Sequence, residues 1–66
     1  MNVPKLKEKM AEKGFNVERL AAQLGIDRST LYRKLDGGVR ITVGEAQTIK
    51  DVLGMTSDEA RSIFFG

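Results

Sequence analysis

Apolar side chains recur three and four residues apart along most of this chain, with polar side chains between them. Val3, Leu6 and Met10 form one such stripe, and this spacing is typical of an amphipathic helix with one buried face. The pattern predicts five helices, over about residues 3–13, 17–24, 28–36, 42–53 and from 56 toward the end of the chain. No stretch shows the strict alternation of a strand, so the predicted fold class is all-α.

Residues that begin and end helices stand at the borders of these segments. Thr42 with Glu45, and Thr56 with Glu59, have the Thr-x-x-Glu spacing of a capping box. Three other side chains are predicted N-caps: Asn2, Asn16 and Asp27. Glycines that can close a last helical turn follow four of the helices: Gly14, Gly25, Gly37 and Gly54. The connections are short, which favours a single compact domain over residues 1–66.

Residues 17–35 have the layout of a helix-turn-helix. A helix of about two turns stops at Gly25, and a second short helix begins three residues later. Ala21 is small enough to let the two helices cross closely, and Gly25 can adopt the positive φ of the turn. Ile26 and Leu31 are predicted to anchor the turn and the second helix in the core.

Composition narrows the function classes. The 66 residues include no His and no Cys, which removes the usual general base and the commonest metal ligands. We therefore expect no enzyme activity, metal site, cofactor or small-molecule substrate. No apolar run approaches the roughly 20 residues of a membrane span, and the first ten residues lack the apolar stretch of a signal peptide. We expect no membrane association.

The charges are unevenly distributed along the chain. Residues 1–40 carry nine Lys or Arg and five Asp or Glu, whereas residues 41–66 carry two and four. A basic N-terminal portion favours an anionic partner such as nucleic acid. The alternative is that these are solvated helix faces. The N-terminal lysines, which have Glu8 and Glu12 beside them, are interpreted as such a face: Lys5, Lys7, Lys9 and Lys13.

The chain resembles the lambda-repressor-like family of phage repressors, Cro proteins and many bacterial regulators in the segment Leu20-Ala21-Ala22-Gln23-Leu24-Gly25-Ile26-Asp27-Arg28-Ser29-Thr30-Leu31. The five-helix layout is similar too, so the resemblance covers nearly the whole chain. Residues 57–65 resemble the last helix of small repressors from phages and mobile elements of Gram-positive bacteria. The resemblance implies a transcriptional regulator, a phage or mobile-element repressor in the bacterial cytoplasm or nucleoid. Its third helix, residues 28–36, would enter the major groove of double-stranded DNA.

Helical geometry selects the side chains that would meet DNA. Leu31 and Leu35 face inward, so the outer surface of the third helix consists of Arg28, Ser29, Tyr32 and Arg33. These four are predicted to contact bases, because a recognition helix presents such side chains to base edges. Five side chains are predicted to contact phosphates: Asn16, Arg19, Lys34, Arg40 and Thr42. The alternatives are that the arginines are solvated, that the Tyr32 ring packs along the helix edge, and that Thr42 only caps a helix.

Two positions depart from the family pattern. Val17 stands where the family often has a Gln that contacts a phosphate, so Asn16 or Arg19 would have to replace that contact. Lys34 stands where the family often has an apolar or aromatic side chain, so Leu35 is expected to supply the packing.

Phe64 and Phe65 are adjacent and cannot both point inward from one helix. We predict that they form the dimerisation surface of a homodimer on a pseudo-palindromic operator, because one short helix reads too few base pairs to select a site. The alternative is that Phe65 is simply a terminal residue. Two other function classes stay open: a protein-interaction domain of the same fold, and the DNA-tethering domain of a larger recombinase.

Overall fold

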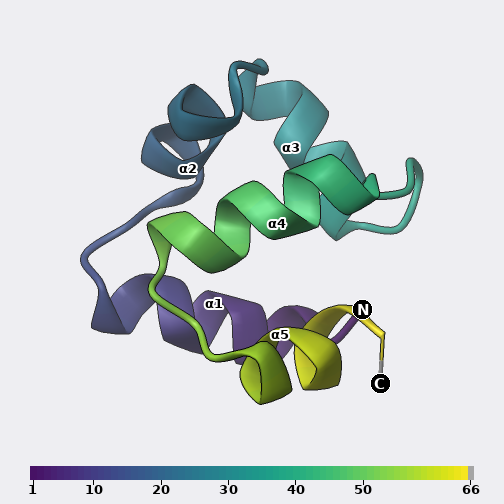
Figure 1. Ribbon diagram of the computed structural model, residues 1–66. Coiled ribbons are helices and arrows are strands. Elements are labelled where there is room, and N and C mark those ends of the chain that lie inside the picture. The colour runs from purple at the N-terminus through teal and green to yellow at the C-terminus, as the bar shows by residue number, and fades with distance from the viewer. Residues whose placement is uncertain (66) are drawn as a thin grey trace.

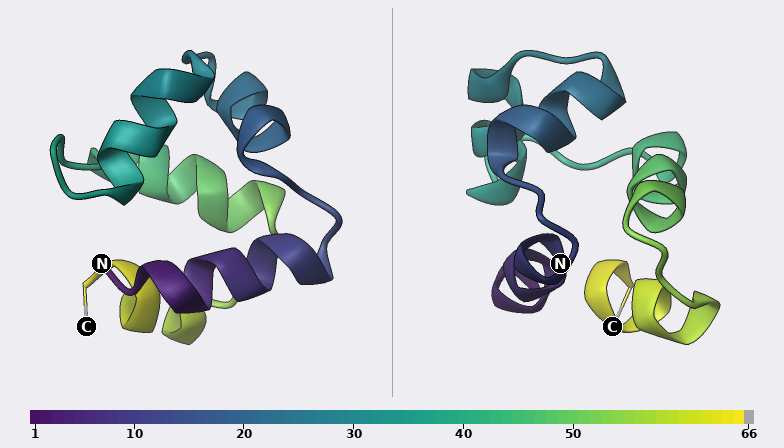
Figure 2. Two further views of the ribbon diagram at one scale, coloured as in Figure 1. Left: turned by 180° about the vertical axis from the view of Figure 1, so that it is seen from behind. Right: turned by 90° about the vertical axis from the view of Figure 1, so that its left-hand side faces the viewer.

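The computed structural model describes residues 1–65, and these form five helices: α1 (Val3–Glu12), α2 (Val17–Leu24), α3 (Arg28–Leu35), α4 (Val43–Val52) and α5 (Ser57–Phe64). The all-α prediction is confirmed, and each helix lies within about two residues of its predicted bounds. In the view of Figure 1, helix α4 lies between α2 and α3 above and α1 and α5 below, and the side view in Figure 2 places α4 toward one side of the molecule. Within residues 1–65, no helix is long and apolar enough to cross a membrane.

One core joins all five helices. Each helix contributes one fully buried large side chain: Leu6, Leu20, Leu31, Ile49 and Ile63. Leu53, where α4 ends, is fully buried beside them. Because a domain of this size has a small core, each of these side chains carries a large share of its stability.

The helix starts follow the predicted capping pattern with one exception. Asn2 and Asn16 each accept a hydrogen bond from the backbone N–H three residues on, at 3.1 and 2.8 Å. Both capping boxes, at the starts of α4 and α5, are present. Asp27 occupies the N-cap position of α3 with extended backbone, but its carboxylate makes no capping hydrogen bond. The predicted N-cap position of Asp27 is therefore confirmed, but the capping hydrogen bond is absent, and the first turn of α3 has no side-chain cap.

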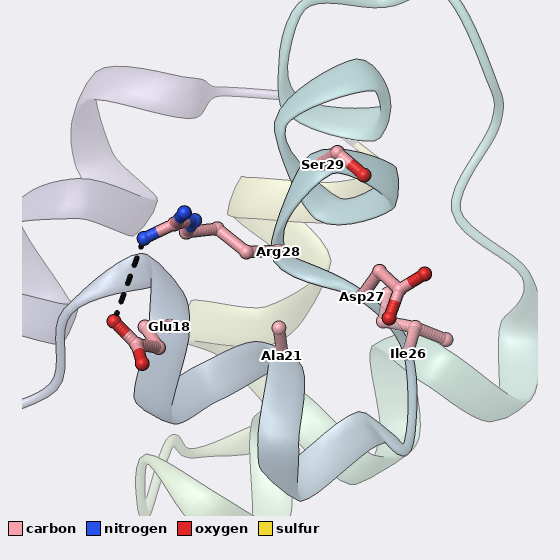
Figure 3. A pocket seen from close by; sticks show the side chains of 6 residues that line it. All are labelled: Glu18, Ala21, Ile26, Asp27, Arg28 and Ser29. Carbon is pink, nitrogen blue, oxygen red and sulfur yellow. Dashed lines mark ion pairs between the residues drawn. The ribbon is translucent and has the colours of Figure 1, made fainter.

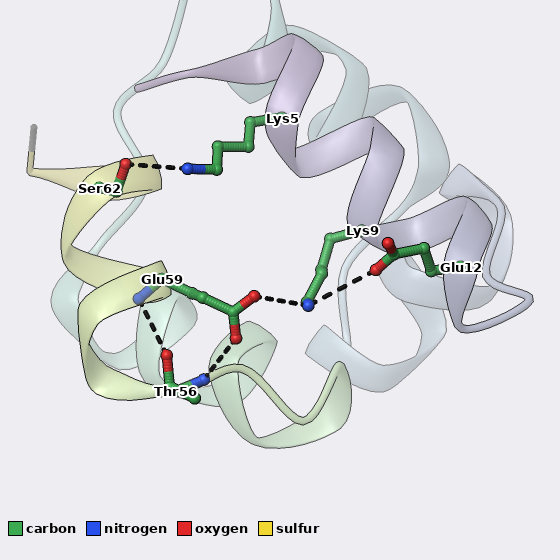
Figure 4. A network of polar contacts seen from close by, with 6 residues as sticks. All are labelled: Lys5, Lys9, Glu12, Thr56, Glu59 and Ser62. Atoms are coloured by element: carbon green, nitrogen blue, oxygen red, sulfur yellow. Dashed lines mark hydrogen bonds and ion pairs between the residues drawn. The ribbon is translucent and has the colours of Figure 1, made fainter.

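Helices α1 and α5 are joined by polar contacts as well as by the core (Figure 4). The Lys9 ammonium lies 2.6 Å from the Glu59 carboxylate, and Lys5 donates a hydrogen bond to Ser62 at 3.2 Å. The hydrogen bond from Lys9, together with one from the Thr56 backbone, lowers the pKa of Glu59 from 4.5 to about 2. The solvated-face interpretation is therefore wrong for Lys9, which is partly buried against Glu59 of α5, whereas Lys5 stays exposed although it donates to Ser62.

Candidate nucleic-acid interface

Helices α2 and α3 and the turn between them take the predicted helix-turn-helix arrangement. Ala21 and Leu31 are buried, with 1% and 0% of their surfaces exposed, and Ile26 packs against the core from the turn. Gly25 has φ +69° and closes α2, as the turn requires. These contacts fix the direction in which α3 leaves the turn, and with it the direction of its outer face.

The outer face of α3 carries the four predicted base-contacting side chains. Arg28, Ser29, Tyr32 and Arg33 are all exposed, while Leu31 and Leu35 are buried on the opposite side. Tyr32 is 48% exposed, so its ring does not pack fully along the helix edge. The structure thus brings these four side chains together on one accessible surface.

The Glu18 carboxylate, from α2, lies beside the Arg28 end of this surface. Arg28 reaches back from the start of α3 toward Glu18 in the first turn of α2, and its Nη1 lies 3.6 Å from the Glu18 Oε2 (Figure 3). The two side chains are 64% and 73% exposed and border an open hollow of about 440 Å³ between α2 and α3. The Asp27 carboxylate points away from this pair (Figure 3). Sequence reasoning missed Glu18, because its place beside Arg28 depends on how the two helices cross.

The start of α2 holds its two predicted phosphate-contacting side chains in defined positions. Asn16 accepts the capping hydrogen bond through Oδ1, so its amide NH₂ remains a possible donor. Arg19 donates to the Gly14 carbonyl at 2.8 Å and lies over the Phe15 ring, 4.8 Å from its centre. Both side chains are exposed, and the Arg19 guanidinium has further N–H donors beyond the one used.

Lys34 is buried, although it was predicted to contact a phosphate. It is only 7% exposed, its Nζ lies 3.0 Å from the Glu45 Oε1, and it donates to the Arg40 carbonyl at 3.2 Å. The predicted phosphate contact of Lys34 is therefore wrong, because the ammonium is turned into the domain. Three residues make a turn of about 300° on a helix, so Lys34 lies only about 60° from the inward-facing Leu31, and this signal was available in the sequence.

Arg40 and Thr42 lie in the connection from α3 to α4, and both are exposed. The Thr42 hydroxyl accepts from the Glu45 N–H at 3.0 Å, while the Glu45 carboxylate accepts from the Thr42 N–H at 2.9 Å. The predicted cap at Thr42 is confirmed. Whether Thr42 also contacts a phosphate stays a prediction.

Exposed apolar side chains gather near the two chain ends. Phe64 is half-buried against the core and Phe65 is 69% exposed, so the prediction that one of the pair faces outward is confirmed. Val43, at the start of α4, is 76% exposed, and Met1 is 48% exposed. All four border a hollow of about 370 Å³ that also reaches Arg40. Sequence analysis did not identify Met1 and Val43 as part of this surface.

Comparison with known proteins agrees with this geometry. The family model of the Cro/C1-type HTH DNA-binding domain matches residues 5–60, a range that includes the whole helix-turn-helix and all of α4. Neither the curated proteins nor the solved structures gave a match. Among residues 1–65, no group of three or more His, Cys, Asp or Glu side chains could hold a metal ion. With the resemblance to lambda-repressor-like proteins confirmed over most of its length, the chain belongs to the Cro/C1-type helix-turn-helix family of DNA-binding domains.

Proposed function

We propose that this domain is a sequence-specific transcriptional regulator, a phage or mobile-element repressor, whose α3 enters the major groove of double-stranded DNA. The observation that carries the proposal is the exposed outer face of α3, where Arg28, Ser29, Tyr32 and Arg33 stand together in a domain of a DNA-binding family. An arginine can donate to both O6 and N7 of guanine, and a serine can read either base type. Such a regulator would act in the bacterial cytoplasm or nucleoid, without a cofactor or catalytic step.

The DNA backbone would be held on both sides of α3. Asn16 and Arg19 stand at the start of α2, and Arg40 and Thr42 stand between α3 and α4. Their exposure supports contacts to phosphates, which position a protein on DNA without reading sequence. Because Lys34 is buried, Arg40 supplies the basic side chain on the α4 side.

Selection of binding sites from a random pool of double-stranded DNA, followed by a salt titration on the selected site, tests the proposal. We expect one enriched sequence and a log–log slope of affinity against salt on the order of −3 to −6 for a dimer, since each neutralised phosphate contributes roughly −0.9. No enrichment and a slope near zero would favour the protein-interaction domain instead. Enrichment of a recombination site by a longer parent protein would favour the recombinase.

We further propose that two copies bind a pseudo-palindromic operator as a symmetric dimer. The molecule measures 28 × 23 × 20 Å, so two copies fit side by side where their α3 helices lie about 34 Å apart, one turn of DNA. The exposed Phe65 and Val43 supply an apolar surface that its own copy could cover. The surface is small, so pairing is expected on DNA rather than in free solution.

The dimer is tested with Phe65→Ser on one half-site and on the full palindrome. Loss of cooperativity on the full site, with half-site affinity unchanged, supports this surface. If wild-type protein binds the full site no more tightly than two independent half-sites, the dimer proposal fails.

A further inference from the structure

Lys34 is the only charged side chain that the structure buries among residues 1–65. A buried ammonium without partners is costly, so such a lysine is retained only where other groups neutralise and hydrogen-bond it. Here the partners come from outside its own helix: the Glu45 carboxylate of α4 at 3.0 Å and the Arg40 carbonyl of the connecting loop at 3.2 Å. Lys34 therefore links α3 both to the start of α4 and to the loop between the two helices.

The Glu45 carboxylate that pairs with Lys34 is itself held in place. The carboxylate accepts from the Thr42 N–H at 2.9 Å and so belongs to the capping box that begins α4. Burial raises the pKa of Glu45, but the hydrogen bonds from Thr42 and Lys34 outweigh it and lower the pKa overall. The Glu45 carboxylate is therefore charged at neutral pH, as its ion pair with Lys34 requires.

The loop between α3 and α4 contains residues that favour a flexible backbone, so contacts from outside the loop can restrict it. It includes Gly37, with φ +85°, and Gly38, and glycines leave a backbone with more conformational freedom than other residues do. Arg40 lies in this loop with its side chain exposed, while its backbone carbonyl accepts the hydrogen bond from Lys34. The hydrogen bond from Lys34 therefore holds the backbone of Arg40, the residue whose side chain is proposed to contact a phosphate.

We propose that Lys34, through its contacts with Glu45 and Arg40, is a positioning residue for DNA binding, which holds Arg40 at a fixed place relative to the outer face of α3. This role rests on the proposed function, because it presumes that α3 and Arg40 meet the same duplex. Lys34 does not touch DNA. It limits the positions that the Arg40 guanidinium can take, so that less freedom is lost when a phosphate is bound.

A purely structural role is the competing explanation, and the choice of variant separates the two. Replacing a buried ion pair by uncharged side chains of similar size is often neutral for stability, whereas removing one partner leaves an unpaired charge. The double variant Lys34→Met/Glu45→Gln removes both charges, and Gln can still close the capping box. Lys34→Arg keeps a cation at this position and is the conservative control.

The experiment measures DNA affinity against salt for wild type, Arg40→Ala, Lys34→Arg, the double variant and the triple variant that adds Arg40→Ala to it, with circular dichroism to check folding. Arg40→Ala should reduce the magnitude of the salt slope by about 0.9 per bound subunit, because one phosphate contact is removed. The double variant keeps the Arg40 charge, so it should bind DNA more weakly at a given salt concentration while its slope changes little. The triple variant should bind no more weakly than Arg40→Ala alone, and Lys34→Arg should keep most of the wild-type affinity. A folded double variant with wild-type affinity, or losses of affinity that add in full in the triple variant, would overturn the role of Lys34 alone. A wild-type slope near zero would overturn the proposed function and this role with it.

A second measurement needs only the wild-type protein and covers the case of a double variant that does not fold. If Lys34 holds the loop, the backbone amides of residues 38–40 should show NMR order parameters close to about 0.85, as in rigid backbone. Values below about 0.6 at these amides would show that the loop is not held, and would overturn the proposal.

Discussion

If Arg28 contacts a base as proposed, Glu18 competes with DNA for its guanidinium, and the Glu18 charge should lower the affinity for DNA. The pair lies at 3.6 Å, where the attraction in water is about 1 kcal/mol. Because the side chains are 64% and 73% exposed, screening and side-chain entropy reduce this to about 0.2–1 kcal/mol. Glu18→Gln should therefore tighten binding to a half-site by about 1.4- to 5-fold, since Arg28 no longer leaves a partner when it meets a base.

Fluorescence anisotropy on a labelled half-site measures this change. Glu8→Gln is the matched control, because it removes the same charge from an exposed position on α1, on the other side of the molecule from α3 (Figure 1). In an Arg28→Ala background the gain from Glu18→Gln should largely disappear. An equal gain for both Gln variants, or an undiminished gain without Arg28, would refute the competition between Glu18 and DNA.

Two further predictions concern stability. The pKa of Glu59 is lowered to about 2 from 4.5, so the stability that the Lys9–Glu59 pair contributes is present above pH 4.5 and is lost as the pH falls toward 2. Glu59→Gln, which keeps the capping box, should flatten the pH dependence of thermal unfolding in that window, and an unchanged dependence would contradict the assignment. Ile49→Ala, at a fully buried position, should lower the free energy of unfolding by about 2–5 kcal/mol in a urea titration, and a loss below about 1 kcal/mol would contradict its place in the core.

The local features of this fold could be predicted because they depend on residues close together in the chain. The Thr42 and Thr56 capping boxes need only a spacing of three residues, and both are present. The closing glycine of α2, Gly25, and the inward face of α3 likewise follow from helical geometry and backbone freedom. The outer face of α3 was therefore predictable as a set.

The features that sequence reasoning missed depend on contacts between helices. The inward direction of Lys34 could be predicted from helical geometry, but its buried partner, Glu45, comes from the start of α4 and could not. Glu18 lies beside Arg28, and Lys9 beside Glu59, for the same reason. A sequence pattern identifies the face of a helix, but not the charged groups that another helix brings to it.

The central claim is that α3 reads bases while the loop before α4 holds the DNA backbone. Site selection with Arg28→Ala, Arg33→Ala and Arg40→Ala tests it most directly. Arg28→Ala should cost about 1–3 kcal/mol on the preferred site and relax the preference at one or two positions of each half-site. Arg40→Ala should weaken binding to all DNA about equally and leave the selected sequence unchanged. If Arg40→Ala altered the selected sequence while Arg28→Ala and Arg33→Ala left it intact, α3 would not be the helix that reads DNA.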